Sequence, residues 1–171
     1  ILEHMVESQH NSKLDSSCFN VCIDGWAKEG SPEKAEELLW RMHRLHKEGI
    51  PNVQPNQISF NSEINDGAKS QHPQAASRAE ELLGKMEQHS CRPSLESYTT
   101  VLAAWAQTPR SGPKVESLLN RLEQMHSNDQ NAPRPNKVSY LTAIRAWTRT
   151  RDHGAPAKAQ ALLRRMEDLS M

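Results

Sequence analysis

The strongest constraint on the fold is an internal repeat. Residues 35–42 and 79–86 are identical at six of eight positions, and residues 115–122 and 159–166 are looser copies of the same segment. Apolar side chains recur in each copy at i, i+3, i+4 and i+7, which predicts a helix with one buried face. A chain that repeats such a helix four times is predicted to form a stacked array rather than a single globular core.

A second recurrent segment precedes each of these helices. It contains an aromatic residue, an aliphatic residue four positions later and, in three of the four copies, a tryptophan seven positions later. The aromatic residues are Phe19, Phe60, Tyr98 and Tyr140; the tryptophans are Trp26, Trp105 and Trp147, with Gly67 in the second copy. Since these positions share one face of a helix, we expect the tryptophans to pack in the core.

Prolines divide the chain into helices and repeats. Proline in the first turn of a helix loses no hydrogen bond, so Pro32, Pro73, Pro113 and Pro156 mark the start of the second helix of each pair. A further proline closes each of the first three units, at Pro55, Pro93 and Pro135. One helical hairpin cannot cover its own apolar face. We therefore predict an all-α fold, a right-handed α-solenoid of about four helix-turn-helix repeats with eight helices.

The predicted array occupies most of the chain. Its repeats are expected at about 15–56, 57–94, 95–136 and 137–171. Residues 1–14 are expected to be a vector-derived or disordered start, because Ile1-Leu2-Glu3-His4-Met5 resembles an expression-vector remnant.

The composition excludes several classes of function. Lys and Arg total 21 and Asp and Glu total 21, so bulk positive charge cannot drive nucleic-acid binding. This neutrality hides a net charge of +4 in residues 137–171, which leaves −4 for the rest. No stretch approaches the roughly 18 apolar residues of a membrane helix, so no membrane partner is expected. Three cysteines without a CxxC motif favour a reducing compartment.

No motif in the sequence points to catalysis. The chain lacks a glycine-rich phosphate loop, a GxSxG elbow and an HExxH pair, so we expect neither an enzyme nor a cofactor. His43 and His46 are three residues apart, but no third ligand stands at a suitable spacing, so no metal site is predicted.

Taken together, the repeats resemble the pentatricopeptide repeat (PPR) proteins. The resemblance covers roughly residues 15 to 171 and rests on Cys18-Phe19-Asn20, on Ser59-Phe60-Asn61, on the Ala-Glu-Glu-Leu-Leu-x-x-Met helices and on the closing pairs Pro55-Asn56, Pro93-Ser94 and Pro135-Asn136. The long units and the late tryptophans indicate a long, Trp-containing subtype. The resemblance implies a sequence-selective module that binds single-stranded RNA, one base per repeat, without catalysis of its own, in RNA metabolism of the mitochondrion or plastid.

The resemblance also implies which side chains select the bases. In this family one selecting residue follows the first-helix aromatic and the other follows the closing proline. Carried over, the pairs are Asn20 with Asn56, Asn61 with Ser94, and Thr99 with Asn136. They imply cytosine, a pyrimidine and adenine, a 5′-C-pyrimidine-A core. Leu141 departs from the pattern, so no base is assigned to the fourth repeat.

Helix geometry adds further contacts around each selecting residue. Positions three before and eight after it lie near the same helix face. The aliphatic residues three before, Ile58 and Val138, are expected to sandwich bases. The cations eight after, Lys28, Lys69 and Arg149, are expected to contact phosphates. Glu96 and Gln107 take these places in the third repeat, which predicts the weakest grip there.

Other interpretations stay open at this point. Asn56, Ser94 and Asn136 are favoured helix N-caps, and capping alone would explain them. Leu141, Glu96 and the zero net charge favour a protein–protein interaction scaffold of the tetratricopeptide type. A catalytic domain outside this sequence is a third possibility. Since neither terminal repeat has an obviously polar cap, self-association through the terminal repeats is also expected.

Overall fold

The computed structural model describes residues 15–69 and 74–169, apart from the side chain of Lys69. Expectations for the start, 1–14, and for Pro73 lie outside this part. Within it the chain forms eight helices and no strand. These are α2 (Ser16–Lys28), α3 (Pro32–Lys47), α4 (Gln57–Lys69), α5 (Ala75–Gln88), α6 (Leu95–Gln107), α7 (Gly112–Asn128), α8 (Lys137–Arg149) and α9 (Ala155–Asp168). The all-α prediction is therefore confirmed.

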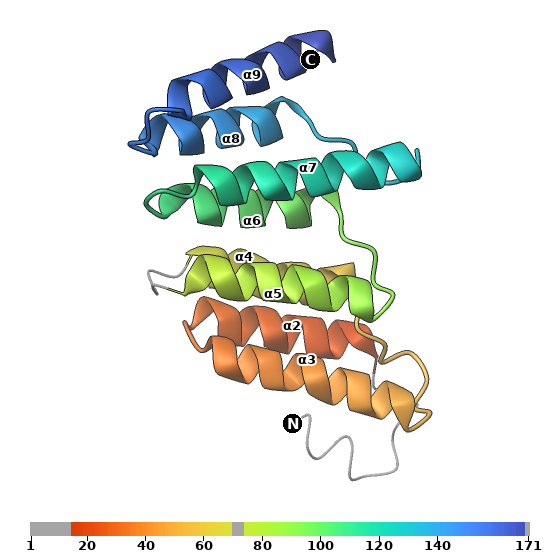
Figure 1. Ribbon diagram of the computed structural model, residues 1–171. Coiled ribbons are helices and arrows are strands. Elements are labelled where there is room, and N and C mark those ends of the chain that lie inside the picture. The colour runs from red at the N-terminus through yellow and green to blue at the C-terminus, as the bar shows by residue number, and fades with distance from the viewer. Residues whose placement is uncertain (1–14, 70–73, 170–171) are drawn as a thin grey trace.

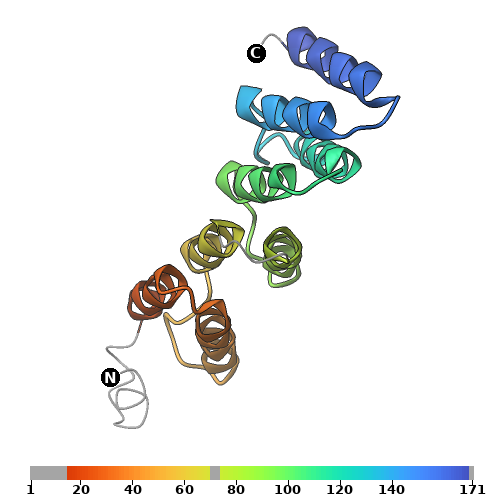
Figure 2. The ribbon, with the colours of Figure 1, turned by 90° about the vertical axis from the view of Figure 1, so that its left-hand side faces the viewer.

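The helices stack as four antiparallel pairs along one direction (Figure 1). Within each pair the two helices contact each other, and the first helix of each pair also contacts the first helix of the next. The first helices, α2, α4, α6 and α8, form one layer, and the second helices, α3, α5, α7 and α9, form the other (Figure 2). This arrangement is an α-solenoid, as the repeat predicted.

The core is a continuous apolar seam between the two layers. The first-helix aromatics Phe19, Phe60, Tyr98 and Tyr140 are at most 1 % exposed. The repeated leucines of the second helices, Leu39, Leu83 and Leu119, are fully buried. The side chains at positions i, i+3, i+4 and i+7 therefore face this seam. The apolar face that one repeat cannot cover by itself is covered by the neighbouring repeat.

Prolines and short polar residues set the helix starts. Pro32, Pro113 and Pro156 lie in the first turns of α3, α7 and α9, as their positions predicted. Ser94 and Asn136 cap α6 and α8, and each forms a capping box with the serine three residues later.

Tryptophan packing is tighter at the C-terminal end. Trp147 is 5 % exposed, whereas Trp26 and Trp105 are partly buried against the core. The prediction of core tryptophans therefore holds fully at Trp147 and in part at the other two. Trp40, which has no counterpart in the other repeats, donates through Nε1 to Glu36 and contacts the rings of His43 and His89.

Candidate nucleic-acid interface

The first repeat brings its two predicted selecting residues together. Asn20, on α2, and Asn56, just before α4, are 36 residues apart, yet Asn20 Nδ2 lies 3.5 Å from Asn56 Oδ1. Asn20 Oδ1 accepts a hydrogen bond of 2.6 Å from the hydroxyl of Ser59. Asn56 Oδ1 accepts from the backbone N–H groups of Ile58 and Ser59. The carbonyl oxygens of both amides are therefore engaged within the protein, while the Asn56 amide nitrogen makes no hydrogen bond to another described residue.

The second repeat reproduces this arrangement. Asn61 Nδ2 lies 3.4 Å from Ser94 Oγ, and Asn61 Oδ1 accepts a hydrogen bond of 2.6 Å from Ser97 Oγ. Ser94 Oγ in turn accepts from the backbone N–H of Ser97. One N–H of the Asn61 amide is left to meet a ligand, so this pair offers fewer amide donors than the first.

The third predicted pair is arranged differently. Thr99 Oγ1 donates to the carbonyl oxygen of Glu96 in its own helix, at 3.1 Å. Asn136 Oδ1 accepts from the backbone N–H and the hydroxyl of Ser139. Within the described part of the chain no hydrogen bond joins Thr99 to Asn136. This pair therefore combines a hydroxyl acceptor with an amide donor.

Three buried serines organise these pairs, and the sequence reasoning gave them no role. Ser59, Ser97 and Ser139 stand directly before a first-helix aromatic and are fully buried. Each hydroxyl accepts from the backbone N–H of the residue that follows the closing proline. Ser59 and Ser97 also fix the asparagine of the preceding repeat. The recurrence of serine three residues after each closing position was the available signal, because it is the spacing of a capping box.

The closing residues are therefore helix caps as well as predicted selecting residues. Asn56, Ser94 and Asn136 each accept from the backbone N–H three residues later. Capping accounts for the oxygens of all three side chains. It leaves the amide nitrogens of Asn56 and Asn136 unexplained, since a cap uses only the acceptor.

The two aliphatic residues predicted to sandwich bases are strongly exposed. Ile58 is 62 % and Val138 57 % exposed, in the first turns of α4 and α8. Val21, directly after Asn20, is 72 % exposed and did not enter the prediction. An exposed aliphatic residue beside each of three selecting positions provides a surface on which an unstacked base can lie.

Two of the three cations predicted to contact phosphates are engaged within the protein. Lys28 forms an ion pair of 2.6 Å with Asp24, and this hydrogen bond is the main cause of the raised pKa of Lys28. Arg149 donates through Nη1 to the carbonyl oxygen of Ala106 at 3.0 Å, which ties it to the preceding repeat. Lys69 is the last residue of α4, and its side chain lies outside the described residues.

A comparison with protein families decides the class of repeat. Residues 17–46 match the family model described as PPR repeat, a span that covers most of α2 and α3. The first helical pair is a PPR repeat. The other three pairs share its two helices and its buried aromatic, and two of them also share its closing proline, so the chain is consistent with a PPR protein. PPR repeats form RNA-binding helical-repeat proteins in general. No curated protein matches the chain. A Trp-containing subtype stays a prediction.

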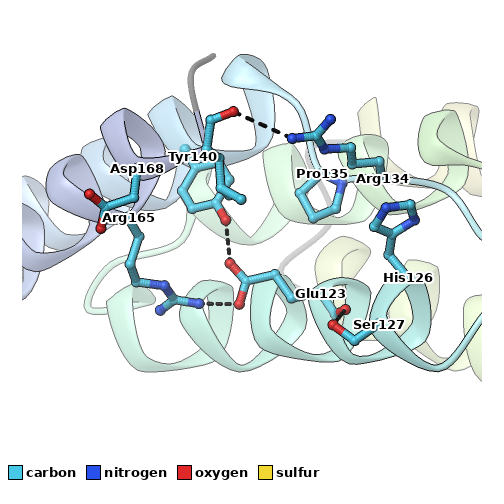
Figure 3. Close-up of a pocket in the computed structure, with 9 residues that line it drawn as sticks. Glu123, His126, Ser127, Arg134, Pro135, Tyr140, Arg165 and Asp168 are labelled. Carbon is cyan, nitrogen blue, oxygen red and sulfur yellow. Dashed lines mark hydrogen bonds and ion pairs between the residues drawn. The ribbon is translucent and has the colours of Figure 1, made fainter. Parts of the chain in front are cut away.

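A hollow of about 340 Å³ lies at the C-terminal end of the helical array, between α7, α8 and α9 (Figure 3). Its polar groups bind one another. Tyr140 donates through its hydroxyl to Glu123, and Arg165 pairs with the other oxygen of the same carboxylate. Arg134 reaches the carbonyl oxygen of Leu169 at 3.4 Å. Burial and the neighbouring carboxylate raise the pKa of Tyr140. The contacts of Glu123 join α7 to α8 and α9.

Neither metal ligands nor a membrane span emerge from the described residues of this chain. No group of three or more His, Cys, Asp or Glu side chains there could hold a metal ion. His43 instead contacts His89, with ring centroids 4.2 Å apart, and desolvation lowers its pKa. No described helix is both long and apolar enough to cross a membrane.

Proposed function

We propose that this protein is a sequence-selective module that binds single-stranded RNA at one base per repeat, without catalysis of its own. The observation that carries the proposal is the unit of Asn20, Ser59 and Asn56, which recurs as Asn61, Ser97 and Ser94. Its members come from two consecutive repeats, and their carbonyl or hydroxyl oxygens are held within the protein. Amide N–H groups remain beside the exposed residue Ile58. The family resemblance adds a setting in mitochondrial or plastid RNA metabolism to the proposal.

Hydrogen-bond chemistry matches the bases that the resemblance implies. The first pair presents amide donors from Asn20 and Asn56, and cytosine carries two adjacent acceptors, N3 and O2, on its Watson–Crick edge. The second pair retains one amide donor, on Asn61, which suits the O2 acceptor of either pyrimidine. The third combines the Asn136 amide donor with the Thr99 hydroxyl acceptor, complementary to N1 and the amino group of adenine. These matches support a 5′-C-pyrimidine-A core.

Substituting Asn56 with aspartate tests the proposed recognition of cytosine without removing the N-cap of α4. Aspartate caps a helix as well as asparagine does, so the stability of α4 is expected to persist. The amide donor becomes an acceptor, however, and faces N3 and O2 of cytosine. We expect Asn56→Asp to weaken binding of a short C-C-A RNA about tenfold, in line with about 1–3 kcal/mol per recognised base. Fluorescence anisotropy titration measures this, with oligo-U and oligo-G of equal length alongside.

Asn131→Asp is the matched control. It introduces the same negative charge at an exposed residue of the α7–α8 connection, which is not one of the predicted selecting residues. We expect it to leave RNA affinity within twofold of wild type, and circular dichroism should show both variants folded. Equal affinity for all sequences, or an Asn56→Asp variant that binds C-C-A RNA as tightly as wild type, contradicts the proposal.

The exposed aliphatic residues favour one alternative, a scaffold that binds a peptide. Val21, Ile58 and Val138 would line an apolar track along the first helices. Salt separates the two functions, because phosphate contacts release counterions and peptide burial does not. RNA affinity is expected to fall steeply between 50 and 200 mM salt, whereas peptide affinity should change little.

The proposal extends to self-association through the terminal repeats. Leu163 is 41 % exposed, although its equivalents Leu39, Leu83 and Leu119 are fully buried. At the inner junctions a cation of one second helix pairs with an acid of the previous one, as Arg121 does with Glu87 and Arg165 with Glu123. The corresponding residues of α3 and α9 are Arg41 and Glu167. A second copy stacked head to tail would bring these two together.

Charge reversal tests the stacking. We expect wild type to form a concentration-dependent series of oligomers, because a head-to-tail contact does not close. Arg41→Glu alone and Glu167→Arg alone should each weaken this association, and the double variant should restore it. Sedimentation velocity over a hundredfold range of concentration measures the effect. A wild-type monomer throughout, or single variants that associate like wild type, contradicts self-association.

A further inference from the structure

In three of the four repeats, a tryptophan and a basic side chain pack together at the same position of the repeat. The tryptophan comes from the first helix, and the cation comes from the second helix of the same repeat. The ammonium groups lie 4.0, 5.5 and 6.0 Å from the ring centroids in the pairs Lys34–Trp26, Lys114–Trp105 and Lys158–Trp147. Each ring is therefore covered by a cation, a favourable arrangement.

A carboxylate from the preceding repeat completes this place. Trp105 donates through Nε1 to Glu80 at 3.0 Å, and Trp147 donates in the same way to Glu116 at 3.0 Å. Glu80 also pairs with Lys114 at 2.8 Å. At the junctions before the third and fourth repeats, an indole ring therefore lies between a cation and a carboxylate.

The second repeat keeps the charged residues and lacks the ring. Gly67 stands where the others have tryptophan, Arg78 takes the place of the lysine, and Glu36 that of the carboxylate. Arg78 lies 2.9 Å from Glu33 and 3.5 Å from Glu36, so its guanidinium is held at the junction. A β-carbon added at Gly67 would meet nothing within 4 Å.

A cavity of about 190 Å³ occupies this place, between α2, α3, α4 and α5. Its apolar wall comes from Ala27, Pro32 and Ala75, and Arg78 and three carboxylates supply its polar groups. The four helices can be located in Figure 1 as the two lowest pairs. Since drug-sized pockets run from roughly 300 Å³ upward, this cavity suits a ligand of one or two rings.

Glu63 gives the cavity a buried carboxyl group, one oxygen of which lacks a hydrogen-bond donor in the described part of the chain. The residue is 2 % exposed, and its Oε2 has no hydrogen-bond partner within the described structure. The other repeats have Cys22, Val101 and Ala143 at this place. A buried carboxyl oxygen without a partner is costly, and the polar contacts of the junction, which centre on Glu36, leave it unsatisfied.

We propose that this cavity binds a flat heteroaromatic ligand whose edge carries two neighbouring N–H donors. The ring takes the place of the missing indole between Ala27, Pro32 and Ala75, and the two donors meet the carboxyl group of Glu63. Two parallel N–H groups match the two oxygens of a carboxylate. Among the described lining residues, Glu33 and Asp66 are also acidic and Arg78 is basic. This acidic lining favours a donor-rich ring over an anion.

The test uses 2-aminobenzimidazole, a flat bicyclic ring with adjacent N–H donors, on the full chain. Isothermal titration calorimetry should give saturable 1:1 binding in the micromolar to millimolar range, and the melting temperature should rise with ligand concentration. Indole, which fits the slot but offers a single donor, should bind at least tenfold more weakly.

Two variants that fill or neutralise the site keep the test decisive. Gly67→Trp supplies the ring that the other repeats have, and Glu63→Val supplies the side chain that the third repeat has. Both are expected to fold, as judged by circular dichroism, and to bind the probe at least tenfold more weakly. Gly84→Ala, on the open surface of α5, should bind like wild type. Absence of saturable binding to wild type, or undiminished binding to Gly67→Trp, overturns the proposal, whatever the RNA titrations give.

Discussion

Replacing Glu63 with valine is expected to stabilise the protein, and to do so more strongly as the pH rises. Burial raises the pKa of Glu63 to about 8, and the nearby charge of Glu36 adds to this. Arg78 and Lys85 act in the opposite direction but are shared with Glu36. Valine fits here because Val101, its equivalent in the third repeat, is fully buried.

The direction of the pH dependence follows from proton linkage. The pKa of Glu63 is about 8 in the folded chain and near its ordinary value of 4.5 in the unfolded chain, so the folded protein holds this proton more tightly. No penalty exists below the unfolded pKa. Stability then falls between about pH 4.5 and pH 8, and the complete shift corresponds to roughly 3–5 kcal/mol.

Urea unfolding at pH 5, 7 and 9 measures this effect. We expect the Glu63→Val variant to gain about 1 kcal/mol over wild type at pH 5 and several kcal/mol at pH 9. Glu37→Gln, which removes an exposed carboxyl from the neighbouring α3, should retain the wild-type pH profile. A difference between wild type and Glu63→Val that does not grow with pH would show that the carboxyl is solvated in the folded protein.

The repeat made the fold predictable from the sequence. Four copies of one apolar period fix the helices, and a helical hairpin with an uncovered face must stack. The prolines then locate the breaks, because their missing N–H and fixed backbone angle suit a first turn, as Pro32 and Pro156 show.

The candidate site was only partly accessible from the sequence. Family spacing brought Asn20 together with Asn56, and the structure agrees on their proximity. The ion pair of Lys28 follows from its position four residues after Asp24. The contact of Arg149 with Ala106 spans 43 residues, so only the packed neighbour repeat reveals it.

The burial of Glu63 could not be predicted from the sequence, for a related reason. It lies in a polar stretch with Asn61, Asn65 and Asp66, and such a stretch indicates a solvated helix face. The face becomes buried only because the preceding repeat covers it, which is a property of the stack and not of the segment. The same applies to Ser59 and Ser97. Their sequence positions indicate exposed residues, but in the structure each serine hydroxyl donates to an asparagine of the preceding repeat.

Glycine to alanine substitutions at two positions are expected to have opposite signs. At Gly112, the first residue of α7, an added β-carbon would lie 2.6 Å from Trp147 Cδ2, 2.7 Å from its Cε3 and 2.9 Å from Thr150 Oγ1. The indole is rigid and 5 % exposed, and Thr150 already accepts from the Gly112 N–H at 3.2 Å. Overpacking of this kind costs about 2–3 kcal/mol.

Gly84 is the matched case, because it lies inside α5 with nothing within 4 Å of an added β-carbon. Alanine has a higher helix propensity than glycine, and it reduces the conformational entropy of the unfolded chain. The substitution is therefore expected to stabilise the protein by about 0.5–1 kcal/mol. Gly112→Ala should therefore lower, and Gly84→Ala raise, the midpoint of urea unfolding. Equal effects of the two substitutions would mean that α7 and α8 do not approach closely at Gly112. Opposite effects would establish that Gly112 is required by the contact between the third and fourth repeats, since propensity alone favours alanine at both positions.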